Sequence, residues 1–169
     1  MKHIPPAAVS IGIVTALPKE FAAMQLQLRD AADIAFPGQG AGLRYAVGRV
    51  KASGGGSHYA ALCLAGMGNN VAAIRAMRLL EHFPQVDDII MVGIAGGVPN
   101  ITKVEDHVRL GDIVVSDLGG VVQYDFVKDE GPFRSEKGST HRPSARLIEA
   151  ARFLEVELQL PSDRLPRPM

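Results

Sequence analysis

Hydrophobic residues along this chain occur in short runs, and glycine, proline or charged residues separate each run from the next. A run of about four to eight apolar residues between such breaks is typical of a buried strand, while apolar residues three and four apart are typical of a helix. This pattern predicts strands over residues 9–15, 43–50, 59–65, 88–94, 111–116 and 119–124. It predicts helices over residues 18–29, 70–83 and 144–154, and it leaves surface loops over residues 30–42 and 125–142.

The run from Asp88 to Gly97 is the one around which we expect the rest of the chain to be arranged. Its apolar residues lie between acidic residues and a glycine cluster, which predicts a fully buried strand of a parallel sheet. Ligands of open parallel sheets bind just outside the carboxyl ends of the strands, and glycine lets backbone approach a ligand closely. We therefore predict a small-molecule pocket at residues 93–97.

Two further stretches predict junctions between a strand and a helix. Ala16 and Leu17 form a turn after the first strand, Pro18 suits the first helical position, and Glu20 falls in the first turn. In the second helix we expect an N-cap at Asn69 or Asn70 and an end before Pro84. We predict that this helix carries one apolar face and one polar face, the first with Val71, Ile74, Met77 and Leu80 and the second with Arg75, Arg78 and His82.

The composition is that of an ordinary globular protein, with 47% hydrophobic residues and a formal net charge of zero. A neutral chain has no electrostatic footprint for nucleic acid or an anionic membrane, so we expect neither as a partner. The single cysteine, Cys63, fits a reducing cytoplasm and is expected to be a small buried hydrophobe. None of the five histidines stands at metal-ligand spacing, so we predict no metal and no cofactor.

Four motifs, in this order, resemble the nucleoside phosphorylase/nucleosidase superfamily. They are Ile11-Gly-Ile-Val-Thr-Ala-Leu-Pro-Lys-Glu20, Ala65-Gly-Met-Gly68, Val92-Gly-Ile-Ala-Gly-Gly97 and Leu110-Gly-Asp-Ile-Val-Val-Ser-Asp117. The chain is most similar to the hydrolytic branch, the methylthioadenosine/S-adenosylhomocysteine nucleosidases. Residues 92–99 and 119–126 also look like phosphorylase-type domains that are fused to signalling modules in immune-type proteins.

The resemblance implies an α/β fold with three α-β-α layers and a mixed central sheet, incomplete at its C-terminus. It implies one such domain over residues 1–160, which leaves residues 161–169 as a proline-rich tail. An incomplete sheet would leave an exposed edge, so self-association into a homo-oligomer is an expectation, with no number of subunits fixed.

The resemblance also assigns roles to individual residues. Glu20 matches the carboxylate that activates the attacking water, and five residues match the pocket of a purine nucleoside or nucleotide: Leu17, Met67, Ile94, Ala95 and Gly96. The chemistry agrees, because breaking an N-glycosidic bond develops positive charge on the sugar, which a nearby carboxylate stabilises. The alternative for Glu20 is an exposed first-turn residue that the helix dipole favours.

Two departures from the family pattern change what the resemblance implies. Phosphorylases place serine or threonine where this chain has Ile94, and an isoleucine cannot donate a hydrogen bond to phosphate, so water is favoured as the nucleophile. The family's ribose-binding Met-Glu pair and its purine-protonating aspartate have no match after residues 144–154. We therefore expect little or no turnover by this chain alone. The alternatives are a nucleoside-sensing module of a signalling or defence protein and an inert truncated fragment.

Overall fold

The computed structural model describes residues 4–36, 43–52, 55–104, 107–116, 120, 127–129, 134–136 and 143–159. The chain divides into two compact units, residues 1–96 and residues 97–169. The domain boundaries expected from the sequence remain a prediction.

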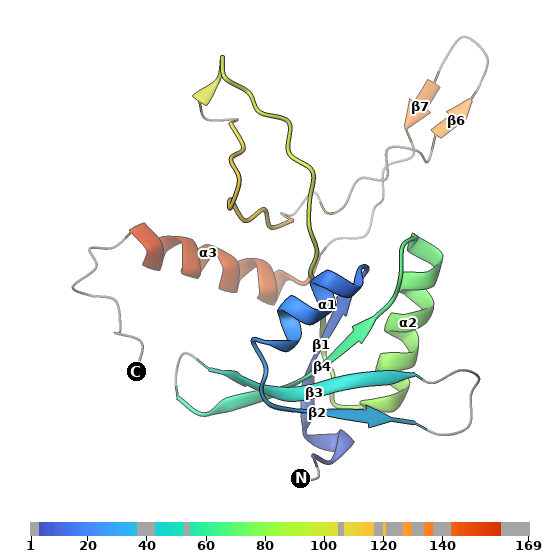
Figure 1. Cartoon of the computed structure of the whole chain (residues 1–169). Helices are drawn as coiled ribbons and strands as arrows, with labels where there is room; N and C mark the ends of the chain where they lie inside the picture. Colours follow the sequence, from blue (N-terminus) through green and yellow to red (C-terminus); the bar gives the residue numbers. More distant parts are fainter. Residues whose placement is uncertain are drawn as a thin grey trace. The chain divides into compact units, whose positions relative to one another are not determined.

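The first unit is built on a five-stranded sheet with the order β2-β3-β4-β1-β5 (Figure 1). β1 lies between β4 and β5 and is parallel to both, whereas β2, β3 and β4 pair in antiparallel fashion. The strands are β1 (Val9–Thr15), β2 (Arg29–Ala35), β3 (Arg44–Lys51), β4 (Ser57–Leu64) and β5 (Asp88–Met91). A short 3-10 helix, η1 (Pro6–Ala8), precedes β1. The sheet is therefore mixed, as predicted.

Two helices cover the two faces of this sheet. Successive residues of a strand point to opposite faces, so each of the central strands supplies two hydrophobic clusters. On one face Ile13 and Leu62 pack with residues of α1 (Pro18–Gln25), and on the other Val14 and Cys63 pack with residues of α2 (Asn69–His82). The result is an α-β-α sandwich, which confirms the predicted α/β class.

The predicted surface loop over residues 30–42 is wrong for its first part, because residues 29–35 form β2. The helix before it ends at Gln25 rather than Arg29, and Leu26, within the predicted helix, lies beyond its end and is 85% exposed. β2 is an edge strand with no buried residue, so no apolar run marks it in the sequence. Its carboxylates pair across to β3 instead, Asp33 with Arg44 at 2.7 Å and Asp30 with Arg49.

The predicted apolar face of α2 is not the face that packs on the sheet. Leu79 and Phe83 are fully buried, and Ala72 packs beside them. The four residues predicted for the apolar face are all 42–56% exposed: Val71, Ile74, Met77 and Leu80. Apolar residues occur almost all round this helix, so spacing alone cannot choose between its faces. Gly68 is the N-cap in place of Asn69 or Asn70, and the helix ends at His82, before Pro84 as predicted.

The strand predicted over residues 88–94 is shorter and more exposed than expected. β5 ends at Met91, and a hydrogen bond of 2.9 Å from the Val92 amide to the Val14 carbonyl extends its pairing with β1 by one residue. Within the described residues β5 pairs with β1 alone, so it forms an edge. Met91 is 66% exposed, and the prediction of a fully buried strand is therefore wrong.

The second unit contains α3 (Ala145–Gln159), which starts near its predicted position and extends five residues past Leu154. Its N-cap is Ser144, as predicted, because the Ser144 hydroxyl accepts a hydrogen bond from the Leu147 amide at 3.4 Å. A small antiparallel pair, β6 (Val127–Asp129) and β7 (Arg134–Glu136), lies where the sequence predicted only a loop.

The predicted strand over residues 111–116 is wrong, since no pairing of these residues is found in the described part of the chain. Ile113, Val114 and Val115 are 60–90% exposed. All but one residue of the strand predicted over 119–124 lies outside the described residues. Among those described, no helix has the length and apolar character that crossing a bilayer requires.

The observed face of α2 predicts different costs for two adjacent leucines. Leu79→Ala removes a fully buried side chain and should lower the free energy of unfolding by about 2–5 kcal/mol. Leu80→Ala is the matched control and should change it by only about 0.5 kcal/mol, because Leu80 is 45% exposed. Urea unfolding of both variants checks this, and a larger loss for Leu80→Ala would contradict the packing described above.

Candidate active site

The Glu20 carboxylate lies at the junction where β1 passes into α1. Leu17 is the N-cap of α1, Pro18 opens the first turn, and Glu20 occupies the third helical position. From there Glu20 Oε2 reaches back to accept hydrogen bonds from the Leu17 amide at 2.8 Å and the Ala16 amide at 3.0 Å. A glutamate at this position commonly caps the free amides of a helix start, so the local sequence favours the arrangement.

A third hydrogen bond joins Glu20 to a segment far away in the sequence. Glu20 Oε1 accepts the Ile94 amide at 2.8 Å, three residues after the end of β5. The residue is only 7% exposed, so the alternative of an exposed first-turn glutamate is wrong. The carboxylate therefore connects the first strand–helix junction to the glycine-rich stretch that was expected to form the pocket.

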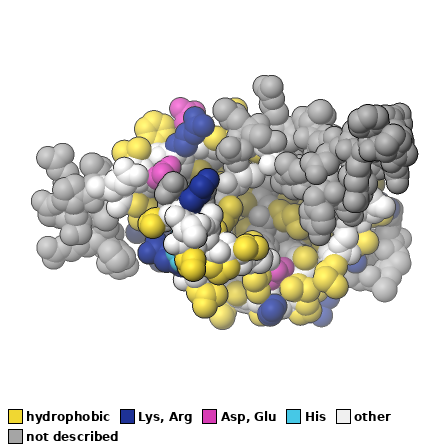
Figure 2. Space-filling view, turned by 90° about the horizontal axis from the view of Figure 1, so that it is seen from above, with side chains coloured by type: hydrophobic (Ala, Val, Ile, Leu, Met, Phe, Trp, Pro, Cys, Tyr) yellow, Lys and Arg dark blue, Asp and Glu magenta, His cyan; other side chains and the backbone are white. Residues whose placement is uncertain are grey.

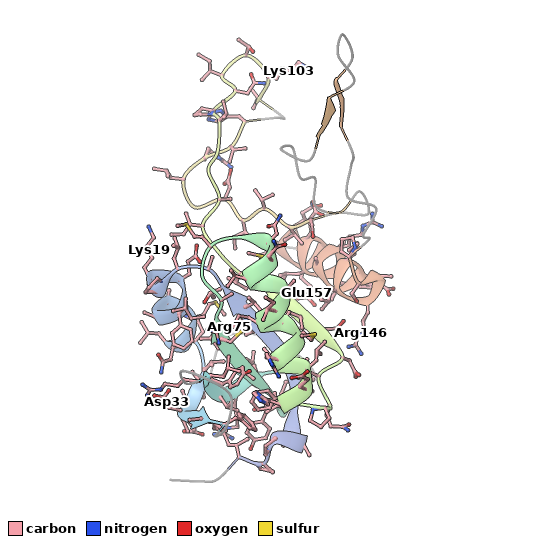
Figure 3. All side chains as sticks on the ribbon, turned by 90° about the vertical axis from the view of Figure 1, so that its right-hand side faces the viewer. Lys19, Asp33, Arg75, Lys103, Arg146 and Glu157 are labelled. Atoms are coloured by element: carbon pink, nitrogen blue, oxygen red, sulfur yellow. The ribbon has the colours of Figure 1, made fainter. Side chains whose placement is uncertain are left out.

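These amides stabilise the charged form of the side chain. The hydrogen bond from Ile94 is the largest cause that lowers the pKa of Glu20 below 4.5, and the bond from Leu17 follows. Burial acts in the opposite direction, while the bond from Ala16 and the positive charge of Lys19, which projects from α1 (Figure 3), lower the pKa further. Glu20 is therefore an anion at neutral pH and remains one to a lower pH than a free glutamate does.

The same bonds leave room for one more hydrogen bond to the carboxylate. A carboxylate offers about four acceptor positions, two on each oxygen. Oε2 uses both of its positions on Leu17 and Ala16, and Oε1 uses one on Ile94. No other donor to the carboxylate is found among the described residues, so the second position of Oε1 remains for a water molecule or a ligand hydroxyl.

The other predicted pocket residues lie mainly at the surface. Ile94 follows Gly93, which is against the carboxylate, and its own side chain is 66% exposed. Ala95 and Gly96 are exposed, and the space around the Cα of Gly96 is open. Met67 is 78% exposed, whereas Leu17 is half-buried at the start of α1. Figure 2 views the molecule from above relative to Figure 1, and hydrophobic side chains make up much of the surface described there.

The structure adds two residues whose roles the sequence patterns did not reveal. Thr15, at the end of β1, is fully buried, and its hydroxyl donates to the Cys63 carbonyl at 3.3 Å, which ties the ends of β1 and β4 together. Gly93 lies directly against the Glu20 carboxylate. The sequence showed the glycine cluster to which Gly93 belongs. It did not show that the Glu20 carboxylate lies against Gly93 and requires a glycine there.

Cys63 and the possible metal ligands of the described residues are not arranged for catalysis. Burial raises the pKa of Cys63 to about 11, so the thiol is a poor nucleophile, and the prediction of a buried cysteine is confirmed. Within the ranges that the structure describes, no group of three or more histidine, cysteine, aspartate or glutamate residues could hold a metal ion.

The fold and the position of Glu20 define an α/β domain in which a buried carboxylate faces the glycine-rich end of a parallel strand. The family model described as Phosphorylase superfamily matches residues 10–161. The chain belongs to the phosphorylase superfamily, which confirms the resemblance seen in its motifs.

The chain is similar to a large nucleotide-binding protein and to bacterial nucleosidases. A nucleotide-binding leucine-rich repeat-like protein of Hyaloscypha variabilis is 31% identical over 151 residues, which cover 86% of this chain and 14% of that protein. The methylthioadenosine/S-adenosylhomocysteine nucleosidase of Colwellia psychrerythraea, solved with adenine, is 26% identical with a TM-score of 0.62. That alignment covers 90% of this chain and 57% of the nucleosidase.

A second solved structure shows likeness of fold alone. The S-adenosylhomocysteine nucleosidase of Streptococcus pyogenes is 19% identical with a TM-score of 0.58, over 90% of this chain and 59% of that one. The chain thus spans less than two thirds of the length of each protein named here.

The hydrogen bonds to Glu20 predict a pH-dependent effect of Glu20→Gln on stability. Because the pKa is lowered in the fold, the carboxylate stabilises the protein fully above pH 4.5, and this contribution is lost as the pH falls through the lowered pKa. We expect Glu20→Gln to lower the urea midpoint at pH 7 and the difference from wild type to shrink below pH 4.5. Glu81→Gln, an exposed residue of α2, is the control for the loss of one charge. A difference that grows in acid would contradict this account.

Proposed function

We propose that this chain forms the sugar-side half of a purine nucleoside site. We further propose that this site hydrolyses the N-glycosidic bond of the nucleoside. The observation that carries the proposal is the Glu20 carboxylate at the glycine-rich end of β5: it is buried and anionic, and no described residue occupies its fourth acceptor position. Membership of the phosphorylase superfamily and the adenine in the Colwellia structure support a purine ligand.

In the proposed reaction, Glu20 holds a water molecule through the free position of Oε1. The bond between the sugar C1′ and the purine nitrogen breaks and leaves its electron pair on the base, while the water oxygen forms a new bond to C1′. The water then loses one proton, and the base gains one. The products are free sugar and free purine, so no phosphate is consumed.

Two features favour water over phosphate as the nucleophile. Phosphate sites are built from hydroxyl, backbone amide and cationic donors. At the position next to Glu20 this chain has Ile94, whose side chain donates no hydrogen bond, and its amide is already used by the carboxylate.

A second candidate function is nucleoside sensing without cleavage. The 31% identity to a nucleotide-binding leucine-rich repeat-like protein supports it. This chain corresponds to 14% of that protein, as expected of one module in a larger protein. The lowered pKa of Glu20 also supports it, since a weakly basic carboxylate accepts a proton from water less readily.

Adenine release separates the two functions. The purified chain is incubated with methylthioadenosine, adenosine or ATP, with and without phosphate, and adenine is measured by chromatography while binding is measured by calorimetry. If the chain is a hydrolase, adenine is released at a rate that phosphate does not change. The release should be slow, because the aspartate that protonates the purine in the family has no match in this sequence. Glu20→Gln should reduce release by about 10²–10⁴-fold, the usual contribution of a general acid or base. The exposed Glu81→Gln should not.

The other outcomes have definite meanings. Binding without release supports the sensing function, and release that requires phosphate contradicts hydrolysis. Release that Glu20→Gln leaves unchanged contradicts the role of Glu20, and absence of both binding and release contradicts both candidate functions.

A further inference from the structure

Gly93 leaves a space that the Glu20 carboxylate fills. A Cβ atom built on Gly93 would lie 3.0 Å from Glu20 Oε1, 3.3 Å from Cδ and 3.4 Å from Oε2. All three carboxylate atoms would be as close as, or closer than, Cβ atoms normally come to their neighbours. The flat face of the carboxylate therefore rests on the bare Cα of Gly93.

The carboxylate cannot move away from an added methyl group without losing hydrogen bonds. Oε2 is held on the far side by the Ala16 and Leu17 amides, and Oε1 is held by Ile94, the residue next to Gly93. On the other side of Gly93, the Val92 amide is bonded to β1. Backbone and carboxylate are thus both fixed where the methyl group would stand.

Backbone conformation does not explain the glycine. The glycines of this chain with positive φ include Gly66 and Gly68, and Gly93 is not among them. Any residue could adopt its backbone angles, so the requirement at position 93 is for space.

We propose that Gly93 is a positioning residue for Glu20: its missing side chain places the carboxylate under the Ile94 amide and leaves one position of Oε1 to hold the reacting water. The catalytic part of this inference rests on the proposed function. The geometric part does not, because it concerns only contacts between Gly93, Glu20 and Ile94.

The test compares Gly93→Ala with Gly96→Ala, a matched control because no heavy atom lies within 4 Å of a Cβ built at Gly96. The chemical shift of the Ile94 amide proton is followed by NMR as the pH is lowered, and it reports ionisation of Glu20. In wild type and in Gly96→Ala we expect a midpoint below 4.5. In Gly93→Ala the midpoint should move toward 4.5 and the change in shift should become smaller. An unchanged titration in Gly93→Ala would overturn the proposal.

A double-mutant cycle covers the case in which Gly93→Ala folds poorly. We expect Gly93→Ala to lower the urea midpoint in wild type, and to lower it much less in a Glu20→Ala background, where the clashing carboxylate is gone. Any effect of alanine on the unfolded chain is common to both backgrounds and cancels. Equal losses in the two backgrounds, or a Glu20→Ala/Gly93→Ala protein that does not fold, would overturn the proposal.

Activity then separates failure of this inference from failure of the proposed function. If wild type releases adenine, Gly93→Ala should reduce kcat while leaving KM near its original value, since the ligand-binding residues are unchanged. A wild-type kcat in Gly93→Ala would overturn the positioning role. If wild type releases no adenine, hydrolysis fails, and the NMR titration and the stability cycle still decide whether Gly93 positions Glu20.

Discussion

The structure of the site depends on one carboxylate that accepts hydrogen bonds from three backbone amides, which belong to two segments far apart in the sequence. Ala16 and Leu17 belong to the first strand–helix junction, and Ile94 follows β5, so Glu20 bridges 74 residues of sequence. Hydrogen bonds to an ionised acceptor are roughly twice as strong as neutral ones, and here they also satisfy amides at a helix start. Val92 packs in the same hydrophobic cluster as Phe21 and Met24 of α1, and the carboxylate adds the one polar bond described between α1 and Ile94.

The sheet order makes this bridge possible. β1 lies between β4 and β5 and runs parallel to both, so its carboxyl end lies beside theirs. The junction to α1 therefore opens next to the stretch that follows β5. Thr15, fully buried, fastens the end of β1 to Cys63 of β4 on the other side. The end of β1 is thus hydrogen-bonded to a strand on each side. This holds the start of α1 in place, and Glu20 can reach Ile94 from there.

The sequence predicted well those features that depend on local chemistry. The bounds of β1, the end of α2 before Pro84 and the cap at Ser144 follow from apolar runs, proline and hydroxyl side chains. Features that depend on neighbours were missed. β2 is an exposed edge without an apolar signature, and β5 pairs with no second strand among the described residues.

The site shows the same division between local and long-range information. Glu20 and the glycine cluster could each be identified from short motifs, and the first-turn position of Glu20 from its proline. That Ile94 would donate to its carboxylate, and that Gly93 would lie beneath it, depends on a contact across 74 residues that no spacing rule encodes. Similarly, α2 is apolar almost all round, so only the packed sheet selects Leu79 over Leu80 as the buried residue.

The bonds that hold Glu20 also limit what it can do chemically. An anion that is stabilised by three amides is a weak base, so it removes a proton from water poorly in the ground state. It suits a reaction in which positive charge develops on the sugar first, because its own charge is already in place and needs no reorganisation. Water bound to such a cation becomes far more acidic, and even a weak base then accepts its proton. In the proposed hydrolysis, Glu20 therefore acts first through its fixed charge and only afterwards as a base.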